Sequence, residues 1–378
     1  MNVIDLFGGV GGFSLGAHRA GFRVPLVIDF DQVLTKSRPV NFPKGRVLHA
    51  DISGLDPISV LDHARLSAKD ISGIIGGPPC QGFSAIGARN PNDPRNGLVL
   101  EFFRFVRAIR PAFFVMENVP GILLDGSRAL LDRGMATVIN EYTLLGPITI
   151  DASEFGAATR RRRVVVIGYR SDVDPIYEGD IETAKTNSVT TVFEAIHDLP
   201  GPEDAMLQDD GEYVAAYQRQ PERGPAGAYA RRARETPPLG LSSALVRSRS
   251  KLSRVTGFKA TLHTDAVRRR FAQLAQGSSD NISRCPRLAW YELCPTLRAG
   301  TGTERGSYQS VRPVHPEHAR VITVREAARL QGFPDWFQFH PAQWHSFRMI
   351  GNSVSPFLAE AILRLLRVRA GGRFLPCS

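Results

Sequence analysis

Short apolar runs alternate with amphipathic stretches over the first 170 residues. The apolar runs predict strands, and recurrence at three- and four-residue spacing predicts helices. We expect strands over residues 3–7, 24–28, 71–75, 113–116 and 164–167, and helices over 14–20 and 98–109. Apolar strands separated by helices are typical of a sheet covered on both faces. The pattern therefore predicts an α/β fold with a mostly parallel sheet.

This regular pattern ends near residue 171. The following sequence is first acidic, then rich in Arg, Gly and Pro, with a few weak strands and one expected helix over residues 265–276. Helical patterns return over residues 324–331 and 355–368, the second with Leu358, Ile362 and Leu365 on one stripe. We therefore expect the middle region to form a second, smaller and less regular domain.

Composition restricts the class of protein. With 378 residues, 43% hydrophobic and 22% charged, the chain can bury a sizeable core. The sequence starts in a strand-like segment without a basic leader, and we see no apolar run of the ~20 residues that span a bilayer. We expect neither a membrane anchor nor a signal peptide. Four separated cysteines without a Cys-x-x-Cys pair fit a reduced cytosolic compartment and exclude the usual zinc spacings.

Charge is unevenly distributed along the chain, whose formal net charge is +10. Residues 172–212 hold twelve acidic residues and one basic residue, whereas residues 219–312 hold eighteen basic and six acidic residues. A basic block of this size favours a polyanionic partner, because each Lys or Arg placed on a phosphate releases counterions. The alternative is a solvated basic surface without a partner.

A glycine-rich loop, DLFGGVGGF, follows the first predicted strand. Glycines let the backbone turn sharply from strand to helix and approach a ligand closely. About twenty residues later, Asp29 ends the second strand, where a carboxylate can bind ribose hydroxyls, and Phe30 offers a face for adenine. Together these features favour an adenosine-bearing cofactor over a simple tight turn with a capping Asp.

Chemically reactive residues follow two further strands. Cys80 lies in a Pro-Pro-Cys turn after the strand 71–75, and Glu117 follows the strand 113–116. A thiol and a carboxylic acid at one sheet edge suggest covalent attack assisted by a proton donor. Residues 160–163 are four arginines that lead into the next strand, and alternation places Arg161 and Arg163 on one side of it.

At this point the sequence resembles a DNA (cytosine-5)-methyltransferase. The blocks that carry the resemblance occur in the family's order from residue 5 to residue 362: DLFGGVGGF, Asp29-Phe30, Asp51-Ile52, GPPCQGFS, DPRNGL, ENVPG, the arginine-led strand, REAARLQGFPD and IGNSVSPFLAEAI. GPPCQGFS followed by ENVPG is the most specific combination. Thr159 departs from the family, which usually has Gln at that position.

The resemblance implies a set of site residues. As catalytic residues it gives Cys80, Glu117, Arg161 and Arg163, the last holding the target base and Arg161 supporting the site. Residues that would bind S-adenosylmethionine, and its product S-adenosylhomocysteine, are Phe7, Gly9, Gly11, Asp29, Phe30, Asp51, Ile52, Pro78, Leu98, Asn352 and Ser353. Contacts to DNA are expected from Gln81, Ser84 and Thr296, and no metal site is expected.

The resemblance also implies a mechanism and an organisation, with an α/β fold whose mostly parallel sheet is doubly wound and Rossmann-like. The thiolate of Cys80 would add to carbon 6 of a flipped-out cytosine so that carbon 5 can accept a methyl group. We expect residues 1–190 with 350–378 to form the catalytic domain and residues 191–349 to recognise double-stranded DNA. A cytoplasmic monomer is expected, with a cognate restriction endonuclease as a functional rather than physical partner where a restriction system exists.

Three alternatives remain open on the sequence. A nicotinamide dehydrogenase would share the glycine loop and Asp29, but has no use for the Pro-Pro-Cys turn. A tRNA methyltransferase of the same family would need little recognition domain, whereas about 150 residues separate Arg170 from the REAARLQGFPD block. A DNA-binding protein that lost catalysis would not need Cys80 or Glu117.

Overall fold

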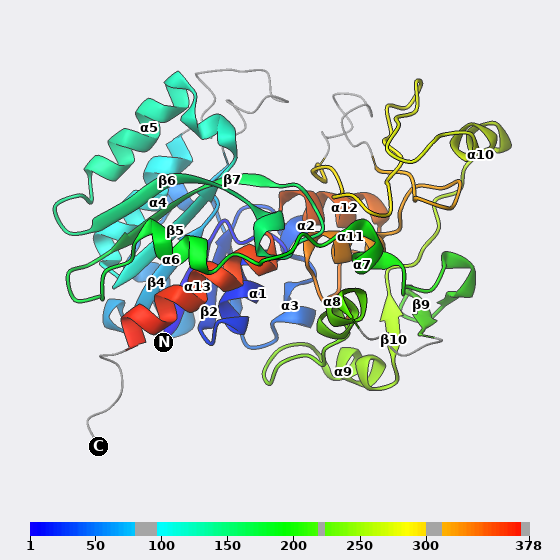
Figure 1. Cartoon of the computed structure of the whole chain (residues 1–378). Coiled ribbons are helices and arrows are strands. Elements are labelled where there is room, and N and C mark those ends of the chain that lie inside the picture. The colour runs from blue at the N-terminus through cyan, green and yellow to red at the C-terminus, as the bar shows by residue number, and fades with distance from the viewer. Residues whose placement is uncertain (80–96, 218–223, 300–311, 372–378) are drawn as a thin grey trace.

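The computed structural model describes residues 1–79, 97–217, 224–299 and 312–371. Within these residues the largest element is a seven-stranded sheet of order β3-β2-β1-β4-β5-β7-β6 (Figure 1). Its strands are β1 (Asn2–Leu6), β2 (Arg23–Asp29), β3 (Arg46–His49), β4 (Ile71–Gly76), β5 (Phe113–Asn118), β6 (Thr143–Asp151) and β7 (Arg162–Tyr169). Neighbours from β3 to β5 pair in parallel, and β7 is antiparallel to both β5 and β6. The predicted doubly wound, mostly parallel α/β fold is confirmed.

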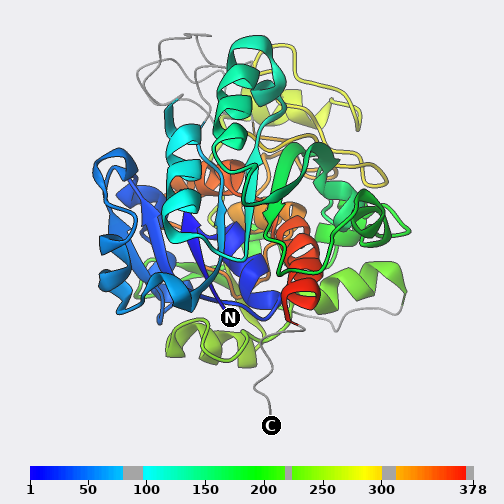
Figure 2. The ribbon, with the colours of Figure 1, turned by 90° about the vertical axis from the view of Figure 1, so that its left-hand side faces the viewer.

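Helices cover both faces of this sheet because its strand residues alternate between two apolar cores. Val3 and Val27 face the core of α1 (Gly12–Arg19) and α13 (Pro356–Gly371), whereas Ile4 and Leu26 face that of α4 (Leu98–Ile109) and α5 (Asp125–Ala136). Figure 2 shows α4 and α13 on opposite sides of the sheet. A Cβ on Gly16 would lie 2.4 Å from the Cβ of Ala359, so this glycine lets α1 and α13 touch.

A second group of elements lies beside the large sheet (Figure 1). It contains a small antiparallel sheet of β8 (Met206–Leu207), β9 (Tyr213–Ala216) and β10 (Arg254–Thr256). Its helices are α7 (Val192–Ile196), α8 (Pro225–Ala233), α9 (Ala244–Lys251), α10 (Asp265–Ala272), α11 (Val324–Gln331) and α12 (Gln343–Asn352). As predicted, this region is less regular than the large sheet. Its division from the catalytic part at residues 191 and 349 stays a prediction.

One predicted helix is shorter than expected. α10 ends at Ala272 rather than at residue 276, because the Arg287 guanidinium donates hydrogen bonds to the carbonyls of Phe271 and Leu274, both at 2.8 Å. A cation that binds carbonyls at a helix C-terminus stabilises the end of the helix there.

Three short helices connect the elements: α2 (Gln32–Thr35), α3 (Arg38–Asn41) and α6 (Glu178–Thr183). At the other end of the chain, the helical stretch Gln343–Gly371 is long and apolar enough to span a membrane by length and composition, but 72% of its most apolar window is buried inside the protein. Such burial is typical of core helices.

Candidate active site

The glycine loop after β1 has an unusual backbone. Phe7 has a φ of 62°, in the left-handed region that residues other than glycine rarely adopt, and Gly9 and Gly11 have φ values of 48° and 106°. The Gly9 N–H donates to Oδ2 of Asp29 at 2.7 Å. This hydrogen bond holds the loop against the end of β2, so the structure brings the predicted loop and the predicted acidic residue together.

Asp29 is the polar centre of this corner. Its two carboxylate oxygens accept from the N–H groups of Gly9 and Asp31, both at 2.7 Å. Burial raises the pKa of Asp29, against the lowering effect of these two hydrogen bonds. Each oxygen keeps a further lone pair for a hydroxyl donor. The next residue, Phe30, is 78% exposed, so a carboxylate and a free aromatic face are adjacent, as adenosine binding requires.

The expected adenine-edge residues lie on the neighbouring segment. Asp51 is exposed, and its carboxylate accepts from the N–H and the hydroxyl of Ser53, which lower its pKa. Ile52 is buried in the core that also contains α4. Leu98 begins α4 and is half-buried against the same core.

The C-terminal block lies against the start of α1. A Cβ on Gly12 would lie 2.0 Å from the hydroxyl oxygen of Ser353, so only glycine fits there. Ser353 is buried, and its carbonyl accepts from the amide of Gln331 at 3.1 Å. Asn352 beside it is exposed. The block thus reaches the glycine loop from residues more than 300 positions away.

Glu117 and Arg163 form an ion pair at the ends of β5 and β7. Nε of Arg163 lies 2.7 Å from Oε1 of Glu117, and each residue is only 8% exposed. Next to Glu117, the Asn118 amide donates to the carbonyl of Pro78 at 2.9 Å, which fixes the turn after β4. A Cβ on Gly77 would lie 3.2 Å from Oε2 of Glu117, so the same turn lies beside the ion pair. The predicted residues Cys80, Gln81 and Ser84 lie outside the described residues.

The four arginines alternate as predicted. Arg160 and Arg162 are exposed, whereas Arg161 and Arg163 are buried. Arg161 is 2% exposed and donates to the carbonyls of Gly351 at 2.9 Å and Leu297 at 3.4 Å. Its contacts join the start of β7 to two distant segments. They are the contacts of a positioning residue.

A hydrogen-bonded seam runs between residues 158–160 and 294–296. Thr159 donates to the carbonyls of Cys294 at 3.3 Å and Pro295 at 3.2 Å, and the Thr296 hydroxyl donates to the carbonyl of Arg160 at 2.6 Å. Thr159 therefore joins the start of the arginine-led strand to the segment 294–296. Thr296 is exposed, so its hydroxyl oxygen can still accept.

Two thiols in the described residues are poor nucleophiles. Burial raises the pKa of Cys294 to about 12, and burial likewise raises the pKa of Cys285. A thiolate, not a thiol, attacks carbon. Neither residue is therefore a rival to Cys80.

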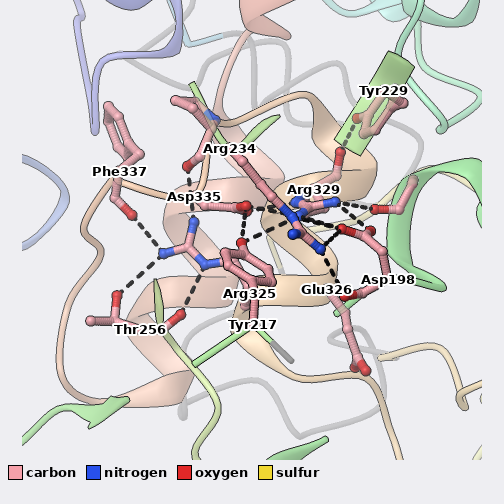
Figure 3. Close-up of polar contacts among 12 residues, drawn as sticks. Asp198, Tyr217, Tyr229, Arg234, Thr256, Arg325, Glu326, Arg329, Asp335 and Phe337 are labelled. Carbon is pink, nitrogen blue, oxygen red and sulfur yellow. Dashed lines mark hydrogen bonds and ion pairs between the residues drawn. The ribbon is translucent and has the colours of Figure 1, made fainter. Parts of the chain in front are cut away.

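The REAARLQGFPD block forms a buried ionic network (Figure 3). Arg329 is 0% exposed and donates to Asp335 at 2.6 Å and to Asp198 at 2.9 Å. Arg325 donates to the backbone carbonyls of Thr256, Pro334 and Phe337. These contacts tie α11 to α7 and to β10. The block has a structural role in joining these elements.

Sequence reasoning missed several residues that shape the site. Asn118 stands inside ENVPG, and only the parallel pairing of β4 and β5 shows that it meets Pro78. Arg38 stands in no motif, yet it is buried beneath the glycine loop. A lone arginine outside any motif carries no signal in a single amino-acid sequence.

Comparisons with known proteins give consistent matches over nearly the whole chain. A family model described as C-5 cytosine-specific DNA methylase matches residues 1–367. The type II methyltransferase M.XorII of Xanthomonas oryzae pv. oryzae is 37% identical over 95% of this chain and 82% of its own length. M.DdeI of Desulfomicrobium norvegicum, also named a type II methyltransferase, is 34% identical over 96% of this chain and 87% of its own length.

Two solved structures have the same fold as this chain. A candidate DNA modification methyltransferase encoded within an E. coli prophage superposes with a TM-score of 0.85 at 39% identity, covering 98% of this chain and 99% of that one. The Dnmt2 methyltransferase of S. pombe shares the fold, with a TM-score of 0.59 at 15% identity over 98% of this chain and 99% of its own. The chain therefore belongs to the C-5 cytosine-specific DNA methylase family and is a DNA (cytosine-5)-methyltransferase.

Proposed function

We propose that this enzyme transfers a methyl group from S-adenosylmethionine to carbon 5 of a cytosine flipped out of a specific double-stranded DNA sequence. The observation that carries the proposal is the buried ion pair of Glu117 and Arg163, which lies beside the turn that leads to Cys80. An acid and a cation meet there, and in the amino-acid sequence the thiol of Cys80 follows Pro78 by two residues. This is the set of groups that cytosine needs, because its carbon 5 is a poor nucleophile until carbon 6 is attacked.

Each residue has a distinct task in this proposal. The thiolate of Cys80 adds to carbon 6, and the electron pair of the 5,6 double bond becomes available at carbon 5. Glu117 shares a proton with ring nitrogen 3 as charge develops there, and Arg163 holds the exocyclic oxygen. After methylation, water takes the proton from carbon 5, the electron pair of that C–H bond restores the 5,6 double bond, and the bond between carbon 6 and sulfur breaks to release the thiolate. Flipping costs a few kcal/mol, which backbone contacts must offset.

The corner around Asp29 fits S-adenosylmethionine, which when bound supplies a methyl group on a sulfonium. The Asp29 carboxylate would accept the ribose hydroxyls, and the exposed ring of Phe30 would cover adenine. Phe7, Gly9 and Gly11 would line the same cofactor from the loop. The remaining assignments follow the family motifs: Asp51, Ile52, Pro78, Leu98, Asn352 and Ser353 for the cofactor, and Gln81, Ser84 and Thr296 for DNA.

DNA is the proposed substrate, and the type II names of the relatives favour a role in a restriction–modification system. Sequencing of methylated cytosines in DNA from cells that express the chain tests this directly. We expect methylation at carbon 5 of one cytosine within one short motif. Methyl transfer to tRNA but not to duplex DNA would overturn the substrate assignment.

A further inference from the structure

We propose that Arg38 is a positioning residue for the methyl donor, and that the acidic residues around it make the site selective for the cationic donor over its neutral product. The inference rests on the proposed function. The observation that supports it is the buried guanidinium of Arg38, which lies against the glycine loop. Arg38 is 2% exposed and donates from one nitrogen to the carbonyls of Gly8 at 3.0 Å and Gly9 at 3.2 Å.

These hydrogen bonds fix which way the peptide groups of the loop face. Two successive carbonyls point at Arg38, while the Gly9 N–H points at Asp29. The chain has no space to relax there, because a Cβ on Gly11 would lie 2.5 Å from the Phe42 ring and 2.8 Å from the Arg38 guanidinium. The Phe42 ring in turn lies 4.9 Å from the guanidinium carbon. Arg38 therefore pre-organises the loop before any ligand binds.

The charge around Arg38 is not balanced. Its second terminal nitrogen donates to the Ser14 hydroxyl at 2.7 Å, and that hydroxyl donates to the carboxylate of Asp5. Asp29 lies on the other side of the loop and interacts electrostatically with both Arg38 and Asp5. Two carboxylates thus face one guanidinium. Nearby Asp31 is already paired with Arg348.

This excess of one negative charge bears on the two ligands differently. S-adenosylmethionine carries a sulfonium that S-adenosylhomocysteine lacks. A buried carboxylate attracts a cation across several ångströms more strongly than the same charge in water. The cluster should therefore strengthen binding of the donor while leaving the product little affected, which helps the product leave after each turnover.

Calorimetric titration with S-adenosylmethionine and S-adenosylhomocysteine tests both parts without using activity. For Asp5→Asn, which can still accept from Ser14, we expect donor affinity to fall by about tenfold and product affinity to stay nearly constant. For Arg38→Met we expect affinity for both ligands to fall by about tenfold or more, since the loop loses its anchor. Arg38→Lys should keep the charge and recover part of this loss.

Arg367→Met is the matched control, because Arg367 also donates to a glycine carbonyl, that of Gly21 at 2.8 Å, at the far end of α1. It should bind both ligands like the wild type. If Arg38→Met lowers the thermal stability but leaves the affinities for both ligands unchanged, Arg38 has only a structural role. An unchanged donor-to-product ratio in Asp5→Asn would overturn the selectivity, even if Arg38→Met does not fold. A wild-type protein that binds neither ligand would instead refute the proposed function itself.

Discussion

The guanidinium of Arg163 lies 2.7 Å from the carboxylate of Glu117. The two side chains that we propose bind the target cytosine are therefore paired with each other before the base binds. Their pairing keeps two buried charges compensated, and it also fixes the position of both groups.

The first prediction concerns Glu117. Replacement by Gln preserves the shape but removes the proton that the ring nitrogen would share, so we expect kcat to fall by about 10²- to 10⁴-fold. The KM for DNA should change little, because the proposed contacts to the DNA sequence lie elsewhere in the chain. Steady-state kinetics with a methylatable duplex measures both. A large rise in KM with kcat preserved would assign Glu117 to binding instead.

The second prediction concerns the nucleophile. Cys80→Ser should abolish transfer of a labelled methyl group while binding of duplex DNA survives, because a serine hydroxyl is far less ionised than a thiol at neutral pH. Cys285→Ser is the control and should stay active, since burial raises the pKa of that thiol and keeps it protonated. Substantial activity in Cys80→Ser would remove Cys80 from the mechanism.

The third prediction concerns the basic helix α10. Arg268 and Arg269 are exposed, whereas Arg270 lies 2.6 Å from the buried Asp280. The double variant Arg268→Ala with Arg269→Ala should weaken binding to all DNA sequences and make the log-log salt slope shallower by about one to two units. Arg270→Ala should lower stability instead. An unchanged slope with loss of discrimination between sites would show that the exposed pair reads bases.

The fourth prediction concerns pH. Burial, with a contribution from Arg38, lowers the pKa of His18 from 6.5 to about 4. The unfolded chain then binds more protons between these values, so this histidine makes stability fall as pH drops from 6.5 to 4, by at most about 3 kcal/mol. Denaturant unfolding of His18→Gln should show a weaker loss over this range. The exposed His63 provides the control variant, and an identical pH profile in both variants would contradict the prediction.

The fifth prediction concerns the network in Figure 3. Asp335→Asn leaves the fully buried Arg329 short of charge compensation, and we expect a loss of about 3–5 kcal/mol in the free energy of unfolding. Asp132→Asn removes an exposed ion pair with Arg128 and should cost under about 1 kcal/mol. Equal losses would mean that the buried network does not hold α7 and α11 together.

Much of the fold was predictable because burial on both faces makes strands nearly continuous apolar runs. β6 (Thr143–Asp151) escaped prediction since it is a half-exposed edge strand interrupted by Gly146-Pro147, where its register against β7 shifts. The antiparallel direction of β7 was equally hidden, because an apolar run has the same composition in either direction. Strand direction depends on the path of the connecting chain.

The residues of the candidate site also divide into those that the amino-acid sequence predicts and those that it does not. Asp29 and Glu117 could be located because each directly ends an apolar strand. The partners of Arg161 could not, since Leu297 and Gly351 lie 136 and 190 residues away and offer only backbone carbonyls. Any residue can offer a carbonyl, so the amino-acid sequence does not mark these contacts.

The contact of Gly16 with Ala359 has a consequence for synthesis. α1 leaves the ribosome more than 300 residues before α13, the helix that covers it. Until α13 emerges, the apolar side of α1 has no native cover, and the contact spans most of the chain, which makes its formation slow. The nascent enzyme therefore cannot complete its glycine loop early. Ser353, which lies against Gly12 of that loop, is available only after residues 20–352 have been translated.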